Sequence, residues 1–173
     1  MSEDFIVSLL AAAITMGTPL LYAALGEVIC ERSGVINLGV EGMMLMGAFS
    51  AVLGSYVTGS AIIGVLFAML VGGLLGFLYC LFCLKFKAHQ SVIGVGLNLF
   101  ASGITKVLLK AIWGQEGMST FVDTIGKVNL PLLKSIPVIG PIFFDQSPFL
   151  YLTLVIVAAV WFVFYRSKFG LRY

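Results

Sequence analysis

The chain has 173 residues, of which 60% are hydrophobic and 10% are Asp, Glu, Lys or Arg, and its formal net charge is +2. A soluble domain carries roughly 25% charged residues, so this composition excludes a soluble globular protein. The small net charge, without a basic run interleaved with aromatic residues, gives no support for nucleic-acid binding, and we expect no nucleic-acid partner.

Hydropathy predicts an all-α, polytopic transmembrane protein. A spanning helix needs about 20 apolar residues. The uncharged run from Gly42 to Leu84 would form a helix of about 65 Å, whereas the hydrocarbon core is about 30 Å thick. We therefore expect this run to fold back at Thr58-Gly59-Ser60. The expected spans are 5–25, with a kink at Pro19, then 36–57, 61–84, 91–112 and 148–165.

Lysine and arginine residues suggest an orientation. Lys85 and Lys87 follow the third expected span, and Arg166, Lys168 and Arg172 follow the fifth. Placing both groups in the cytoplasm puts the N-terminus outside, and it makes residues 113–147 an outer loop. The turn with Glu27, Glu31 and Arg32 then lies inside, where a solvated ion pair is one reading and a contact with a cytoplasmic partner is another.

The most distinctive polar group stands at the start of the second span. Asn37 and Glu41 are four residues apart, so on a helix they would share a face. Gly34, Gly39 and Gly42 surround them and weaken the helix, which predicts a broken helix near residues 34–42. One reading is a helix N-terminus with a capping Asn and a favourable acidic residue. The other is a broken helix that faces a translocation pathway.

Further polar or small residues interrupt the later spans. Asn98 lies within the fourth span, where an amide in hydrocarbon needs a partner, either another helix or a ligand. Lys106 and Lys110 share a helical face and can extend toward water, or they can line an outer vestibule. Gly72 and Gly76 have the spacing that lets two helices approach closely. The candidate pathway and gating residues are Asn37, Gly39, Glu41, Gly42 and Asn98.

Catalytic and cofactor motifs are missing from the sequence. It contains no P-loop, no Gly-x-Ser-x-Gly and no His-Glu-x-x-His. Cys80 and Cys83 lie inside an apolar segment with no His or further Cys near them, so these two and Cys30 suggest neither a zinc site nor a disulfide framework. His89 is the only histidine and is expected in a solvated loop. We therefore expect no enzyme activity, no metal and no cofactor in this chain.

Two blocks carry a resemblance to a known family. Residues 31–49 (ERSGVINLGVEGMMLMGAF) resemble the signature of ABC-transporter permeases that import nucleosides and simple sugars, with the nucleoside-importer branch the nearest. Residues 90–100 (QSVIGVGLNLF) resemble a second block, and residues 136–141 and 169–172 fit later stretches. The resemblance covers essentially the whole chain. Asn37, Glu41 and Asn98 fall within its motifs.

The resemblance implies several partners. It implies an importer subunit in the plasma (inner) membrane of a prokaryote that works by alternating access. A second related permease, cytoplasmic ATP-binding subunits and an extracytoplasmic substrate-binding protein would assemble with it, and ATP would bind the partner subunits. Because family members are longer, residues 1–173 are expected to be the N-terminal portion of a permease domain, truncated before the coupling segment.

Two alternatives from other classes remain open at this point. One is a channel-like or secondary transporter that works without ATP. The other is a membrane-embedded enzyme, against which the absence of clustered catalytic residues argues. Dependence of uptake on ATP hydrolysis separates the first alternative from the leading reading.

Overall fold

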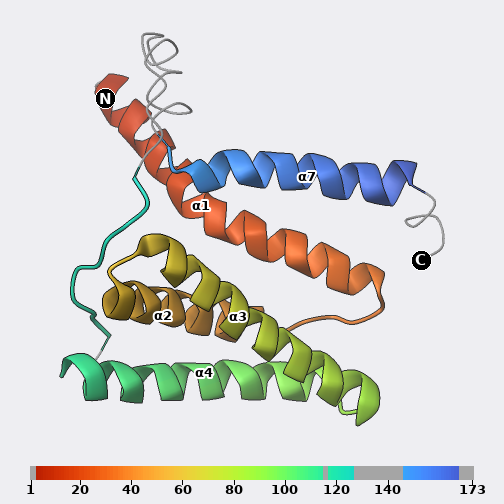
Figure 1. Ribbon diagram of the computed structural model, residues 1–173. Helices are drawn as coiled ribbons and strands as arrows, with labels where there is room; N and C mark the ends of the chain where they lie inside the picture. Colours follow the sequence, from red (N-terminus) through yellow and green to blue (C-terminus); the bar gives the residue numbers. More distant parts are fainter. Residues whose placement is uncertain (1–2, 115–116, 127–145, 168–173) are drawn as a thin grey trace. The chain divides into compact units, whose positions relative to one another are not determined.

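The computed structural model describes residues 3–114, 117–126 and 146–167, and these ranges contain helices and connecting segments but no strand. Figure 1 shows the helices in chain order. They are α1 (Glu3–Arg32), α2 (Val40–Thr58), α3 (Ala61–Cys80), the π-helical η1 (Leu81–Lys85), α4 (Gln90–Trp113) and α7 (Pro148–Arg166). The expectation of an all-α protein is confirmed.

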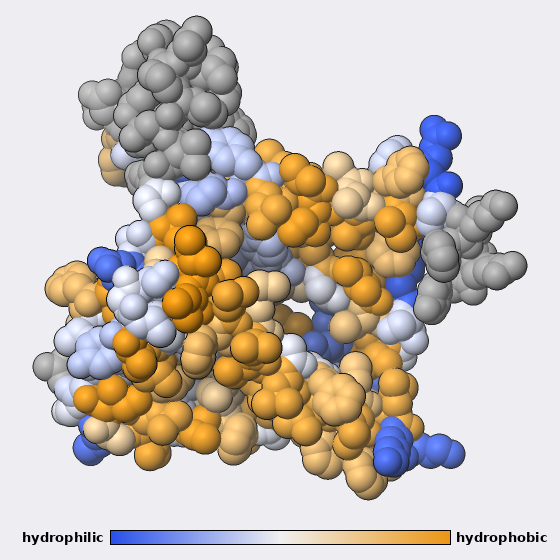
Figure 2. All heavy atoms as spheres, in the orientation of Figure 1, coloured by the Kyte–Doolittle hydropathy of each residue, from blue (hydrophilic) through white to orange (hydrophobic). Residues whose placement is uncertain are grey.

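Five helices among the described residues are long and apolar enough to cross a membrane, and η1 extends the third of them from Ala61 to Lys85. Hydrophobic residues cover most of the helix surfaces visible in Figure 2. Such exposed apolar surface suits contact with lipid. The described part of the chain thus contains five helices suited to span a membrane, the number expected. Most of the expected outer loop at 113–147 lies outside the described residues.

Helix α1 is longer than the first expected span. It continues through Pro19, which is tolerated inside membrane helices, and it ends at Arg32. Glu27, Glu31 and Arg32 were expected in a turn, and that expectation is wrong because they lie in the last turns of α1. The segment from Glu27 to Arg32 contains neither Gly nor Pro, and Glu and Arg are good helix formers.

Helices α2 and α3 form a hairpin at the predicted turn. Gly59 has a φ of +67° and its N–H donates to the carbonyl oxygen of Ser55 at 2.8 Å, an arrangement that ends many helices. The close approach of the two helices lies at Gly54 and Gly64, because a Cβ on Gly64 would be 2.5 Å from the Ala51 carbonyl oxygen.

The glycine pair predicted to mediate helix packing behaves differently. A Cβ on Gly72 or Gly76 would meet no atom within 4 Å among the described residues. The expectation of close packing there is not met within this part of the chain. Spacing alone identifies a groove on a helix but not the helix that fills it.

The chain divides into two compact units. One comprises residues 1–28 and 125–173, and the other comprises residues 29–124. In the first unit, the Thr15 hydroxyl donates to Oε1 of Gln146 at 2.8 Å, and the Tyr22 hydroxyl donates to the Phe149 carbonyl oxygen at 2.9 Å. These bonds join α1 to α7 and to Gln146, which lies two residues before α7. The second unit contains every candidate pathway residue.

Candidate functional site

The candidate site is built around residues 33–39, the non-helical linker between α1 and α2. Gly34 has a φ of +83°, a backbone conformation that glycine adopts readily. Its N–H donates to the Glu31 carbonyl oxygen, and the Val35 N–H donates to that of Cys30 at 3.1 Å, so both residues complete the end of α1. The predicted broken helix is therefore present, and α2 begins at Val40 rather than at residue 36.

The linker passes into a small buried core. Val35, Tyr79 and Cys83 are buried together, with Met43 and Ile93 packed against them. Irregular backbone at membrane depth is tolerated only where protein buries it or where it lines a cavity. Each polar backbone group of the linker therefore needs a partner, and side chains of α3 and α4 provide several of them.

Asn98 on α4 binds the start of α2 with both ends of its amide. Its Oδ1 accepts a hydrogen bond from the Gly42 N–H at 2.7 Å, and its Nδ2 donates to the Leu38 carbonyl oxygen at 3.0 Å. The N-cap residue of α2 is Gly39, which has no side chain to cap the helix. The first N–H groups of a helix have no partner within it, so Asn98 performs the capping role from a neighbouring helix.

Asn37 lies before α2 and not on it. Its Oδ1 accepts a hydrogen bond from the Gly39 N–H at 3.1 Å, and its Nδ2 lies 3.5 Å from the sulfur of Met43. The expectation that Asn37 and Glu41 share a helical face is therefore wrong. Asn side chains bond readily to the backbone two residues onward, which competes with helix formation, and here that local bond prevails.

Three glycines allow α4 to lie against the linker and the start of α2. A Cβ on Gly42 would come within 2.9 Å of Asn98 Oδ1, and one on Gly39 would come within 2.8 Å of Leu97 Cδ2. From the opposite side, a Cβ on Gly94 would meet Leu38 at 2.7 Å. Gly39 and Gly42, predicted as pathway residues, thus have a direct packing role.

Two residues of the site were missed from the sequence. The Tyr79 hydroxyl donates to the Ile36 carbonyl oxygen at 2.7 Å, and Oε1 of Gln90 accepts from the Ile36 N–H at 3.0 Å. Tyr79 is a polar-tipped residue inside an apolar span, and Gln90 begins the second motif block. The requirement that a polar group in hydrocarbon find a partner was the signal that could have identified Tyr79.

Glu41 differs from the two asparagines. It lies in the first turn of α2, where the helix dipole favours a negative charge, and its side chain is exposed. Within the described ranges its carboxylate makes no hydrogen bond or ion pair. Among the predicted pathway residues, Glu41 is therefore the one whose polar group is available to water or to a solute.

The remaining chemistry of the site is simple. No group of three or more His, Cys, Asp or Glu residues that could hold a metal ion occurs in the described part of the chain. His89 is exposed and immediately precedes α4. What the site offers is one carboxylate in the first turn of α2, next to a linker held by its neighbours. It can bind or orient a polar solute, and it contains no pair of groups arranged for covalent catalysis.

Comparison with known proteins identifies the class. The profile of the branched-chain amino acid transport system permease component matches residues 9–173, and the chain belongs to this family. The family consists of transmembrane components of transporters rather than enzymes, which confirms the expectation of no catalytic activity in the chain.

Individual relatives are transporter subunits. The chain is 35% identical over 171 residues to the nucleoside ABC transporter permease protein NupC of Lactococcus lactis, and 34% identical over 168 residues to the guanosine ABC transporter permease protein NupQ of Bacillus subtilis. It is 38% identical over 169 residues to TsgC13 of Haloferax volcanii, provisionally named a glucose ABC transporter permease protein. These matches confirm the predicted resemblance.

The similarity covers most of this chain but only part of each relative. It includes 95%, 93% and 98% of the chain, against 54%, 53% and 51% of the respective relatives. The chain thus spans about half the length of the curated relatives it matches. No solved structure matches it.

Proposed function

We propose that residues 1–173 form the N-terminal portion of a permease subunit of an ABC importer for nucleosides or related simple sugars. The observation that carries this proposal is the similarity to nucleoside, guanosine and glucose permeases over 93–98% of the chain. It includes both motif blocks that build the linker site. In this function the chain moves substrate by alternating access, while ATP is hydrolysed on separate subunits.

The proposed partners follow from this class of transporter. They are a second related permease, cytoplasmic ATP-binding subunits and an extracytoplasmic substrate-binding protein. The lysines and arginines after the third and fifth spans support an orientation with the N-terminus outside and the linker near the cytoplasmic surface. The lipid bilayer of a prokaryotic plasma membrane is the surrounding medium.

Within the site we assign different roles to the candidate residues. Glu41, exposed and without a partner among the described residues, faces the solute route. Asn37, Gly39, Gly42 and Asn98 fix the position of the helix start that presents it, through the bonds and close contacts of the linker. The last four thus contribute to gating through position rather than by direct contact with the solute.

Uptake by cells tests this assignment. The natural reading frame is expressed with its neighbouring transport subunits, and entry of radiolabelled guanosine, ribose and glucose is compared in wild type and Glu41→Gln. A hydrogen bond to a charged group contributes about 1.5–3 kcal/mol, so uptake at limiting substrate should fall roughly tenfold or more. Asp123→Asn, which changes an exposed carboxylate outside the linker and α2, is the control and should retain uptake.

Two results would contradict the proposal. Uptake at the wild-type rate by a normally inserted Glu41→Gln protein would show that Glu41 acts only as a residue at the helix end. Uptake that continues with ATPase subunits unable to hydrolyse ATP would instead favour the channel-like or secondary transporter. Competition among the three solutes assigns the substrate class in the same assay.

A further inference from the structure

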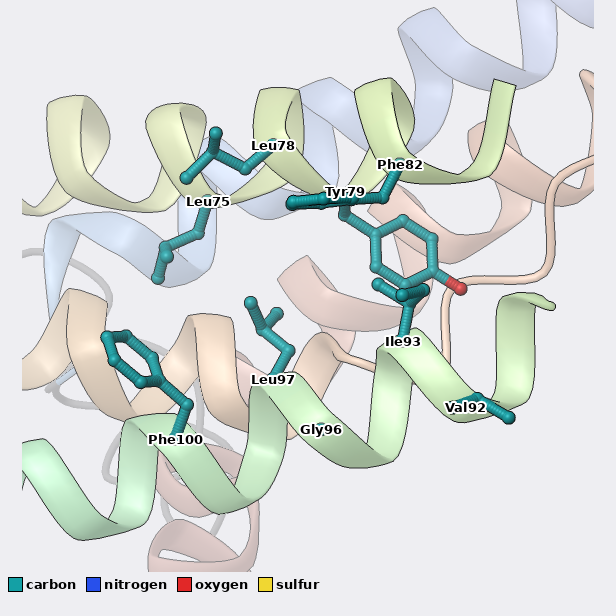
Figure 3. A pocket seen from close by; sticks show the side chains of 9 residues that line it. All are labelled: Leu75, Leu78, Tyr79, Phe82, Val92, Ile93, Gly96, Leu97 and Phe100. Carbon is teal, nitrogen blue, oxygen red and sulfur yellow. The ribbon is translucent and has the colours of Figure 1, made fainter. Parts of the chain in front are cut away.

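An apolar groove lies between α3 and α4, beside the ring of Tyr79. It has a volume of about 320 Å³ and is lined by Leu75, Leu78, Phe82, Val92, Leu97 and Phe100, together with Tyr79 and Gly96. Figure 3 shows Leu75, Leu97 and Phe100 extending into the space between the two helices, with the Tyr79 ring at one end of that space. Because the Tyr79 hydroxyl bonds to the linker, the groove presents hydrocarbon and aromatic surface.

The groove has a defined direction. Phe82 and Val92 lie at the end where α3 passes through η1 toward α4, and Leu75 and Phe100 lie deeper in the spans. From Val92 to Phe100 the helix rises about 12 Å. Both helices are long and apolar enough to cross a membrane. Because two helices of this length would cross a bilayer, a groove between them would run roughly along the membrane normal.

A basic segment follows at the end of this groove. Lys85 ends η1, Lys87 and His89 lie between η1 and α4, and all three are exposed. Within the described part of the chain, none of their side chains makes an ion pair or hydrogen bond. A second hollow of about 490 Å³ is lined by Lys87, His89, Gln90 and Ser91, with Ile36, Leu38 and Ala88. Ser91 and Val92 are consecutive, so the second hollow and the apolar groove have neighbouring lining residues in the first turn of α4.

We propose that this composite surface binds one anionic phospholipid. The phosphate lies at Lys85 and Lys87, and one acyl chain occupies the groove between α3 and α4. The charge of the segment complements an anionic headgroup and gives no preference for a zwitterionic one. The apolar lining can contact an acyl chain without leaving a polar group unpaired.

Native mass spectrometry provides the test. The complete protein, purified in a mild detergent, is titrated with a phosphatidylglycerol and with a phosphatidylcholine of the same acyl chains, and the retained lipid is counted. Phosphatidylglycerol should be retained in preference. Lys85→Gln with Lys87→Gln should lower its affinity about 30-fold, since each lysine near the surface contributes to anionic lipid binding. Rising salt should weaken binding by wild type.

A second variant examines the groove without changing charge. Gly96 lines it, and a Cβ there meets no described atom within 4 Å, so Gly96→Leu fills the groove without forcing the helices apart. It should reduce lipid retention severalfold. Gly103→Leu is the matched control, because Gly103 is also exposed on α4 with nothing near its Cβ and lies outside the groove. Lys106→Gln is the corresponding control for charge.

The outcomes distinguish a bound phospholipid from a simple anion and from a docked protein helix. Loss of binding in both the lysine and Gly96 variants, with both controls unchanged, supports the lipid. Equal retention of the two lipids would overturn the proposal, as would undiminished binding by Gly96→Leu. Displacement of phosphatidylglycerol by inorganic phosphate alone would show a simple anion site, and exclusion of lipid by a protein subunit seated in the groove would show a helix-docking surface. Either result would also overturn it.

Discussion

Oδ1 of Asn98 accepts a hydrogen bond from the backbone N–H of Gly42 at 2.7 Å, although the two residues are 56 positions apart in the chain. The same amide donates to the Leu38 carbonyl oxygen, so one side chain joins the last turn of the linker to the first turn of α2. A helix that lacks a capping side chain at its own N-cap thus obtains one from α4. The motif containing Asn98 and the motif containing Gly42 therefore form a single structural unit.

Removing the Asn98 amide should destabilise the protein. Asn98→Ala leaves the Gly42 N–H and the Leu38 carbonyl without the partners they have in the structure, at a cost of about 1–3 kcal/mol. The free energy of unfolding in mixed detergent micelles, measured by titration with a denaturing detergent, gives the size of the loss. Ser102→Ala is the control, because the Ser102 hydroxyl makes no hydrogen bond within the described residues. Equal stability of the two variants would contradict the capping role.

A methyl group at Gly42 should separate α2 from α4. In Gly42→Ala the new Cβ would lie 2.9 Å from Asn98 Oδ1 and 3.0 Å from its Cα, so the backbone must shift, at a cost of about 1–3 kcal/mol. Gly47→Ala, also on α2, places its Cβ at 3.9 Å from the Ala68 carbonyl oxygen, an ordinary contact. It should be neutral or stabilising, since Ala favours a helix over Gly by about 1 kcal/mol. Thermal denaturation of both variants should rank Gly47→Ala above Gly42→Ala.

The hydroxyl of Tyr79 should stabilise the linker by its hydrogen bond. Tyr79 is 1% exposed, and in Tyr79→Phe the ring remains while the Ile36 carbonyl oxygen loses its donor. We expect a loss of about 1–3 kcal/mol in the free energy of unfolding and faster proteolysis of the linker. Tyr56→Phe, at a residue that is 52% exposed, should leave both measurements unchanged. An unaltered cleavage rate in Tyr79→Phe would show that the linker does not depend on this bond.

The hairpin of α2 and α3 offers a similar comparison. Gly64→Ala brings a Cβ within 2.5 Å of the Ala51 carbonyl oxygen, whereas the same change at Gly72 meets nothing within 4 Å among the described residues. Gly64→Ala should therefore lower the thermal midpoint by several degrees, and Gly72→Ala should not. Midpoints measured in the same detergent decide the point. A larger loss at Gly72 would indicate that another helix occupies that face.

The helices were largely predictable because their signals are local. Long apolar runs define the spans, and the Thr58-Gly59-Ser60 turn follows from a run too long for one crossing. The break before α2 was predictable from the glycines at 34, 39 and 42, since glycine weakens a helix. The end of α1 was harder to predict, because hydropathy indicates which residues can lie in lipid and not where helical hydrogen bonding stops.

The partners within the site required the tertiary structure. The sequence placed Asn98 in a span and indicated that its amide needs a partner, yet the identity of that partner depends on how α4 packs. Asn37 was assigned to a helix because its spacing from Glu41 fits one, whereas its own side chain bonds to the Gly39 N–H. Likewise, glycine spacing pointed to Gly72 and Gly76, while the close contact occurs at Gly54 and Gly64. The transport roles of Asn37, Gly39, Glu41, Gly42 and Asn98 stay predictions.

The origin of the linker's hydrogen bonds also constrains how the protein is made. A ribosome synthesises residues 33–42 before Tyr79, Gln90 and Asn98, which later bind this segment. Until the last of these enters the bilayer, the Leu38 carbonyl and the Gly42 N–H lack their final partners, and hydrocarbon tolerates such groups poorly. The bonds that fix the start of α2 can therefore form only after Asn98 has been synthesised, so this part of the fold is completed late.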